Sequence, residues 1–250
     1  MARELISKNA TKSVYRDGDK AVKVFCKGFP KAEVLNEALI SARVEAIGGI
    51  NIPSIQAVSV EEDGCWSITR DYIEGKTLTE LMKEKPDKRD EYLNQMVELQ
   101  LMIHSKTCPL LNKLKDKMAR QISEMEELDP VNRYDLLTRL DSTPKHIKLC
   151  HGDFQPDNII VKEDGTMYVV DWVHATQGNA SADVARTYLL FCLTDQAAAE
   201  KYLDLFCEKT GTAKRYVLLW QPLVAAAQLA KKRPEEKELL QSWLNVCDYQ

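Results

Sequence analysis

The first 75 residues alternate short apolar runs with polar turns, whereas the rest of the chain has mostly longer runs with a helical period. Apolar runs of strand length occupy residues 5–6, 14–15, 21–25, 55–60 and 65–69. Turn-forming residues such as Asp17, Gly18 and Asp19 separate neighbouring runs, which favours strands that reverse direction. The pattern therefore predicts an antiparallel sheet of about five strands.

One amphipathic segment interrupts this sheet, and several follow it. Apolar positions three and four apart predict a helix over residues 31–47, at Val34, Leu35, Ala38, Leu39, Ala42 and Ala46. After Gly75, Thr77 is a typical N-cap for a short helix. Helical periods then cover residues 87–105, 110–128, 131–140, 195–209 and 216–247. We therefore expect an α+β protein with a sheet-rich N-terminal lobe (1–75, including a hinge) and a mainly helical C-terminal lobe (76–250).

The segment from residue 150 to 172 carries the most specific chemistry. Asp153 precedes Asn158 by five residues, and an apolar run, a turn and a second apolar run then lead to Asp171. The two runs, 159–161 and 167–170, predict a β-hairpin, which would bring Asn158 and Asp171 to the same end. Amide and carboxylate oxygens are suitable ligands for Mg²⁺, and a further carboxylate can take or orient the proton of an attacking hydroxyl. The segment thus predicts a phosphoryl-transfer site.

This segment resembles the aminoglycoside phosphotransferase and choline kinase family, whose His-Gly-Asp-x-x-x-x-Asn replaces the His-Arg-Asp-x-x-x-x-Asn of protein kinases. The resemblance covers nearly the whole chain in its order of elements. It implies a bilobal protein-kinase-like fold, with Mg²⁺ as cofactor and ATP as phosphate donor, GTP not being excluded. It makes Asp153 the catalytic residue and Asn158 and Asp171 the metal ligands. His151 is expected to support the catalytic loop rather than to act as an acid.

The resemblance extends to the N-terminal lobe. Lys23, in the third predicted strand, would contact the α- and β-phosphates, and Glu37 on the following helix would pair with it, with Glu33 one turn earlier as the competitor. The loop at residues 8–13 contains no glycine, although protein kinases use glycine there to bring the backbone close to phosphate. Thr11 and Ser13 are the candidate phosphate contacts that this leaves.

Residues 70–75 resemble the family's hinge between the lobes. Adenine recognition at a hinge uses backbone groups, and we assign it to the main-chain atoms of Asp71 and Ile73. The choice between ATP and GTP stays open at this point.

The segment after Asp171 distinguishes between branches of the kinase superfamily. Protein kinases continue with Phe-Gly and a long segment ending in Ala-Pro-Glu, which forms the platform for peptide substrates. This chain instead reaches Asp183 within twelve residues. Asp183 resembles the family's second aspartate, which steadies the catalytic loop. Asn179 stands where the family more often has aspartate.

Composition and charge bear on which macromolecules, membranes or metal ions the protein could bind. The formal net charge is −4, and the basic residues are dispersed, which gives no support to nucleic-acid binding. Seven cysteines occur without a Cys-x-x-Cys pair, so neither a disulfide framework nor a zinc site is indicated. No apolar stretch suggests a signal peptide or a membrane span. We expect a cytoplasmic enzyme with no membrane, nucleic-acid or obligate protein partner.

The sequence leaves the acceptor open. The favoured function is transfer of the γ-phosphate to a hydroxyl of a small molecule such as an aminoglycoside, a choline-like compound, thiamine or a sugar. The alternatives are an atypical protein serine/threonine kinase and a non-catalytic nucleotide-binding scaffold. Carboxylates on the helix at 195–209 suit either a cationic acceptor or an ordinary solvated helix face: Asp195, Glu200, Asp204 and Glu208.

Overall fold

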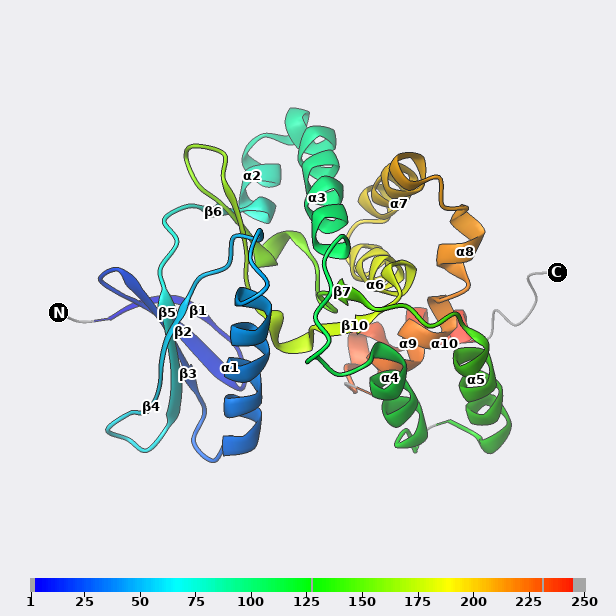
Figure 1. Cartoon of the computed structure of the whole chain (residues 1–250), viewed down its shortest axis with the longest axis horizontal. Coiled ribbons are helices and arrows are strands. Elements are labelled where there is room, and N and C mark those ends of the chain that lie inside the picture. The colour runs from blue at the N-terminus through cyan, green and yellow to red at the C-terminus, as the bar shows by residue number, and fades with distance from the viewer. Residues whose placement is uncertain (1–2, 127, 231, 245–250) are drawn as a thin grey trace. The chain divides into compact units, whose positions relative to one another are not determined.

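A computed structural model describes residues 3–126, 128–230 and 232–244. The chain divides into two compact units (Figure 1). The first unit comprises the residues up to Pro86 together with Pro156–His174. The second comprises Asp87–Gln155 and the residues from Ala175 onward. The predicted catalytic hairpin thus belongs to the same unit as the N-terminal sheet.

The first unit is built on the expected five-stranded antiparallel sheet, which is confirmed with the strand order β1-β2-β3-β5-β4. Strands β1 and β2, β2 and β3, and β4 and β5 pair with one another through short turns. Helix α1 (Lys31–Glu45) lies between β3 and β4 in the chain, and β3 pairs with β5 rather than with β4. The strands are β1 (Glu4–Lys8), β2 (Lys12–Asp17), β3 (Lys20–Phe25), β4 (Ile55–Val60) and β5 (Trp66–Asp71).

Helix α1 closes the apolar core of this unit. Its Val34 and Ala38 pack with Phe25 of β3 and Ile68 of β5. The helix forms where the sequence predicts it, but its buried face is different, because Glu37 is turned inward and leaves some of the apolar positions in solvent. The buried residues are Val34, Glu37, Ala38, Ile40, Ser41 and Val44. The exposed ones include Leu35 and Leu39.

The hairpin forms a second, three-stranded sheet in the order β6-β8-β9. Strand β8 (Ile159–Val161) pairs with β9 (Met167–Val169), and β6 (Lys76–Thr77) pairs with β8. Gly165 makes the turn with a positive φ of 83°, as a tight hairpin requires. Short helix α2 (Leu78–Glu84) follows β6 and begins with a complete capping box between Thr77 and Glu80.

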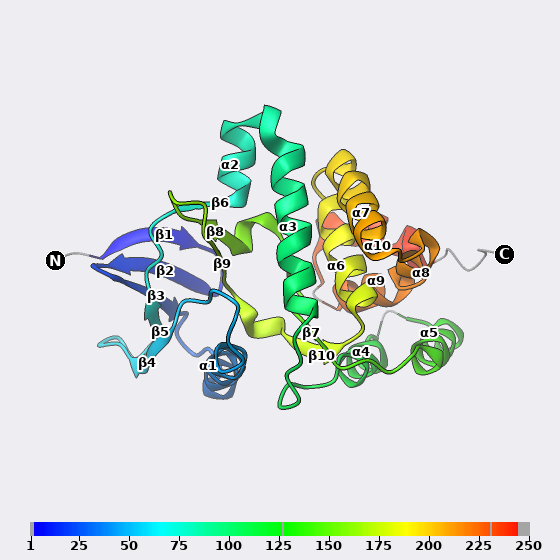
Figure 2. The same cartoon turned by 45° about the horizontal axis from the view of Figure 1, so that its top comes forward.

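The second unit is mainly helical, as predicted (Figure 2). A two-stranded ladder of β7 (Lys148–Cys150) and β10 (Thr176–Gly178), which the sequence did not indicate, lies in it. Helix α6, central to the unit, is buried along most of its length. The helices are α3 (Arg89–His104), α4 (Leu114–Ser123), α5 (Pro130–Ser142), α6 (Ala180–Cys192), α7 (Gln196–Thr210), α8 (Lys214–Leu218), α9 (Gln221–Leu229) and α10 (Lys237–Leu244).

The helical region expected over residues 216–247 is broken into shorter pieces. Pro222 stands in the first turn of α9, where its missing N–H is tolerated, and so separates α9 from α8. Lys232 has a positive φ of 53°, which ends helical geometry before α10. Cys247 lies outside the described residues. No helix in the described part of the chain is long and apolar enough to cross a membrane.

A close contact between β10 and α4 allows a test of packing in the second unit. An ideal Cβ on Gly178 would lie 2.5 Å from the Leu114 Cβ atom. We expect Gly178→Ala to lower the free energy of unfolding by about 1–3 kcal/mol, because the added methyl overpacks this contact. In a Leu114→Gly background the same change should cost much less, since the obstructing Cβ atom is gone with the rest of the side chain. Chemical denaturation of the four proteins measures both values, and equal penalties in the two backgrounds would contradict the packing explanation.

Candidate active site

The first unit contains a cavity of about 620 Å³, within the range typical of small-molecule sites. All of its lining residues belong to that unit. Most of them come from the β1–β2 region, from β3 and β5, from the segment between β5 and β6 and from the β8–β9 hairpin with its flanking residues, and Pro53, Thr77 and Glu80 complete the lining. The lining includes three cationic residues, the two expected hinge residues and the two potential metal ligands: Lys12, Lys23, Arg70, Asp71, Ile73, Asn158 and Asp171.

A buried charge cluster lies at this cavity. The Lys23 Nζ atom is 2.5 Å from Glu37 Oε1 and 3.0 Å from Asp171 Oδ1. Arg70 also contacts Glu37, at 3.2 Å, and its Nε atom is buried without a hydrogen-bond partner among the described residues. Burial lowers the pKa of the Lys23 ammonium, and the Asp171 and Glu37 carboxylates oppose that effect. Glu33, the alternative partner for the lysine, is exposed.

Asp171 follows β9 in a left-handed conformation, with a φ of 61°. Aspartate is one of the few residues that tolerate this region, and such outliers are frequent at functional sites. The Val170 N–H donates to the Asn158 carbonyl at 3.0 Å, so the hairpin places Asn158 and Asp171 at the same end, and both line the cavity. Burial alone would raise the pKa of Asp171, but the Lys23 and Lys12 ammoniums hold that pKa well below its usual range.

The donor set at this end of the hairpin fits a magnesium ion. Asn158 offers an amide oxygen and Asp171 a charged carboxylate, and both are hard oxygen ligands. Mg²⁺ is commonly held by one or two protein oxygens, with water and substrate phosphates completing its shell. The cations that share the cavity, and the unpartnered Nε of Arg70, suit the phosphates of a nucleotide.

The expected hinge residues both line the cavity, but the backbone of Asp71 is partly used by the fold. The Asp71 N–H donates to the Ser54 carbonyl at 3.0 Å, and the Asp71 carboxylate accepts from the Ser54 N–H and from Gln56. A purine contact from Asp71 would therefore have to come from its carbonyl oxygen. Ile73, two residues further on, is the other residue whose main-chain atoms are expected to bind the purine.

The structure does not bring Ser13 to the cavity. Side chains alternate along β2, and Lys12 and Val14 line the cavity while Ser13, between them, is absent from its described lining. Lys12 and Arg70 were not predicted as site residues. For Lys12 the missing information was the strand register: Val14 lies directly opposite Lys23, and Lys12, two residues before Val14, shares its face.

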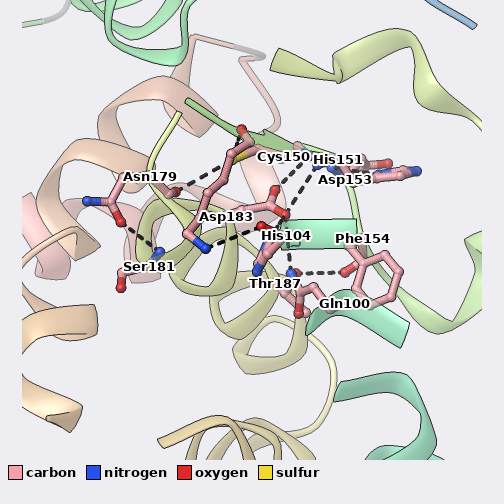
Figure 3. A network of polar contacts seen from close by, with 12 residues as sticks. Gln100, His104, Cys150, His151, Asp153, Phe154, Asn179, Ser181, Asp183 and Thr187 are labelled. Atoms are coloured by element: carbon pink, nitrogen blue, oxygen red, sulfur yellow. Dashed lines mark hydrogen bonds and ion pairs between the residues drawn. The ribbon is translucent and has the colours of Figure 1, made fainter. Parts of the chain in front are cut away.

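In the second unit, Asp183 is the centre of a hydrogen-bond network (Figure 3). Its carboxylate accepts from the backbone N–H groups of Gly152, at 2.7 Å, and His151, at 3.2 Å, and contacts His104 Nε2 at 2.9 Å. Asp183 is 2 % exposed. Burial alone would raise its pKa, but the His104 contact and the Gly152 hydrogen bond hold the pKa of Asp183 below its usual value.

The predicted catalytic loop is attached to this network. The buried His151 ring accepts a hydrogen bond at Nδ1 from the Asp153 N–H, at 3.2 Å, and packs edge-on against Phe154. The Thr187 hydroxyl donates to the Phe154 carbonyl at 2.9 Å. Consecutive residues of the loop are therefore tied to α6, and the contacts of His151 agree with the expectation that it supports the loop.

Asp153 lies beside cations that the sequence analysis did not single out. Arg186 is 3.6 Å from the Asp153 carboxylate and also hydrogen-bonds to Gln228. Gln228 in turn donates to Glu236 at 2.5 Å. Burial and the nearby Arg186 lower the pKa of Lys117 to about 8, while Asp153 opposes them. The spacing of Asp183 and Arg186, three apart on one helix face, was the signal for Arg186.

Carboxylates of the α7 region are mostly paired within the fold. Asp195 caps α7 through the Ala198 N–H and forms an ion pair with Arg89. Lys214 contacts both Glu200, at 2.8 Å, and Asp204, at 2.9 Å. These pairs favour the interpretation of α7 as an ordinary charged helix face over that of a site for a cationic acceptor.

Comparison with known proteins identifies the class to which this fold and these motifs belong. Residues 3–218 match the model of the phosphotransferase enzyme family. No curated protein gives a significant match. The chain belongs to the phosphotransferase enzyme family, and the expected family resemblance is confirmed.

Solved structures show the same kinase-like fold at low sequence identity. A thermostable mutant of the aminoglycoside phosphotransferase APH(4)-Ia, in its apo form, is 15 % identical with a TM-score of 0.71, over 98 % of this chain and 92 % of that one. A choline/ethanolamine kinase family protein from Mesorhizobium loti is 16 % identical with a TM-score of 0.63, over 99 % and 89 %. The GDP complex of aminoglycoside 2′-phosphotransferase-IIIa is 17 % identical with a TM-score of 0.63, over 98 % and 91 %.

The Asp183 network generates a prediction about stability and its dependence on pH. Asp183→Asn should lower the free energy of unfolding by about 3–5 kcal/mol near neutral pH, because buried donors lose a charged acceptor. The folded pKa of Asp183 lies below the unfolded value, so its contribution is present above that unfolded value, about 3.9, and is lost as the pH falls through the folded pKa. The difference between wild type and variant should therefore shrink below about pH 4.

Chemical denaturation near neutral pH and at a pH well below 4 measures this difference. Asp141→Asn, at an exposed position on α5, is the matched control and should leave stability nearly unchanged. A penalty for Asp183→Asn of the same size at both pH values would show that its origin is not the carboxylate charge.

Proposed function

We propose that the protein transfers the γ-phosphate of magnesium-bound ATP to a hydroxyl group of a small molecule. The observation that carries the proposal is the cavity of the first unit, where Lys23 and two potential metal ligands, Asn158 and Asp171, line one space. Lys23 is held there by a buried ion pair with Glu37. A cavity of this size with converging cations and oxygen ligands suits a nucleoside triphosphate.

Each predicted site residue that lines this cavity or pairs with a lining residue then has a role. Asn158 and Asp171 would hold the magnesium ion, which when bound neutralises charge on the phosphate oxygens. Lys23 would contact the phosphates, with Glu37 fixing its position. The backbone atoms of Asp71 and Ile73 would bind the purine, and either ATP or GTP is compatible with them.

Asp153, in the second unit, would act on the acceptor. Its carboxylate would orient the acceptor hydroxyl and receive its proton as the oxygen bonds to the γ-phosphorus. The bond from that phosphorus to the bridging oxygen breaks, and the nucleoside diphosphate leaves. His151 and Asp183 would keep the loop that carries Asp153 in place through the contacts described above.

The family supports a small-molecule acceptor but leaves its identity as a proposal. Among the similar structures, a mutant APH(4)-Ia forms a ternary complex with ADP and hygromycin B, at 15 % identity and a TM-score of 0.68. For this chain we propose an aminoglycoside, a choline-like compound, thiamine or a sugar-type molecule. A protein substrate is less favoured, because only eleven residues lie between Asp171 and Asp183 and no peptide platform fits between them.

Transfer of labelled γ-phosphate tests the proposal directly. Labelled ATP or GTP with Mg²⁺ is incubated with the enzyme, a panel of these acceptors and a cell extract that is afterwards separated by size. We expect label in a small-molecule fraction. Asp153→Asn should reduce the rate by at least about a hundredfold, since the proton acceptor is lost. Asp164→Asn, in the exposed turn of the hairpin, is the matched control and should leave the rate unchanged.

The other outcomes separate the alternatives. Label on macromolecules that depends on Asp153 would indicate a protein kinase. Nucleotide binding without Asp153-dependent transfer to any fraction would indicate a non-catalytic scaffold.

A further inference from the structure

The β1–β2 loop uses its own backbone donors and leaves few for a phosphate. The Asn9 side-chain oxygen accepts the N–H groups of Thr11 and Lys12, both at 3.0 Å. The Asn9 N–H donates back to the Lys12 carbonyl at 2.9 Å. The Thr11 hydroxyl donates to the same Asn9 oxygen at 3.2 Å. This glycine-free loop is therefore a closed turn, unlike a glycine-rich loop whose amides face the ligand.

Lys12, the residue that follows this turn, does point to the cavity. It shares a face of β2 with Val14, which lies opposite Lys23 of β3. Its Nζ atom is 3.4 Å from Asp171 Oδ2, and Lys23 is 3.0 Å from the other oxygen of the same carboxylate. Two ammonium groups therefore flank the proposed metal ligand.

The two lysines differ in how firmly they are held. The Lys23 side chain is 6 % exposed and is paired with Glu37, whereas the Lys12 side chain is 26 % exposed. Lys12 therefore has more room to change partner than Lys23 has.

We propose that Lys12 binds the terminal phosphates of the nucleotide, in place of the backbone amides of a glycine-rich loop. The inference rests on the proposed function, because it requires a nucleoside polyphosphate in this cavity. On binding, Lys12 exchanges the Asp171 carboxylate for a phosphate oxygen. Asp171 would hold the metal, and a phosphate bound next to Asp171 would lie within reach of the Lys12 ammonium, which already contacts that residue.

Binding of nucleotides of different phosphate length tests the assignment without knowledge of the acceptor. Calorimetry with Mg²⁺ gives the Kd of a non-hydrolysable ATP analogue, ADP and AMP for the wild type and for Lys12→Met. We expect Lys12→Met to weaken the ATP analogue by about tenfold or more and ADP by less, because a charge-assisted hydrogen bond is lost. AMP binding should stay within about twofold, since AMP lacks those phosphates.

Two further variants define the result. Lys12→Arg should retain most of the affinity, because it keeps the charge. Lys20→Met, at an exposed position on β3, removes a lysine from the same sheet and should change nothing.

The contrary outcomes are distinct. Unchanged binding of the ATP analogue by Lys12→Met overturns the role of Lys12 and leaves the proposed function standing. Tighter binding also overturns it, and shows instead that Lys12 blocks Asp171. An equal loss for AMP overturns it as well, because general damage to the cavity would explain the effect. A wild type that binds no nucleotide overturns both this inference and the proposed function.

Discussion

The buried ion pair between Lys23 and Glu37 is the interaction on which the first unit depends. A lysine that is 5 % exposed is stable there only because carboxylates satisfy it. That requirement turns Glu37 inward on α1, which sets the face that this helix presents to the sheet. It also places Asp171, the second partner of Lys23, beside the cavity. Core packing and the arrangement of the charged groups are therefore consequences of the same pairing.

In the second unit, too, buried polar groups need partners, and a single carboxylate, that of Asp183, supplies them. The Asp183 carboxylate accepts hydrogen bonds from the loop that precedes Asp153 and contacts His104 of α3, and these partners are buried or half-buried. The loop that carries Asp153 thus derives its shape from an acceptor thirty residues away in sequence. Arg186 adds a contact from the same helix to Asp153 itself. Helix α6 supplies both the support and a neighbouring charge.

Much of this arrangement could be predicted from local sequence patterns. Short apolar runs separated by polar turns predicted the sheet and the hairpin, because both depend on residues close in sequence. The position of α1 was also predictable. Its buried face was not predictable. Glu37 is buried and Leu35 and Leu39 are exposed because Glu37 pairs with Lys23, which lies in strand β3. Lys12 was overlooked because its direction depends on strand register, which a run of polar residues does not reveal. Arg186 and Gln228 are far apart in the sequence, so no local pattern predicts the hydrogen bond between them.

The closed turn at Asn9 has a consequence for the entropy of nucleotide binding. A flexible loop that orders around a ligand loses about 1–2 kcal/mol of conformational freedom for each residue fixed. Here the backbone is already held by hydrogen bonds to the Asn9 side chain before any ligand arrives. If phosphate recognition falls to Lys12, binding needs to immobilise one side chain, whose rotamer entropy is about 2 kcal/mol. In that case the ordered loop would need no glycine, and only the Lys12 ammonium group would have to adapt.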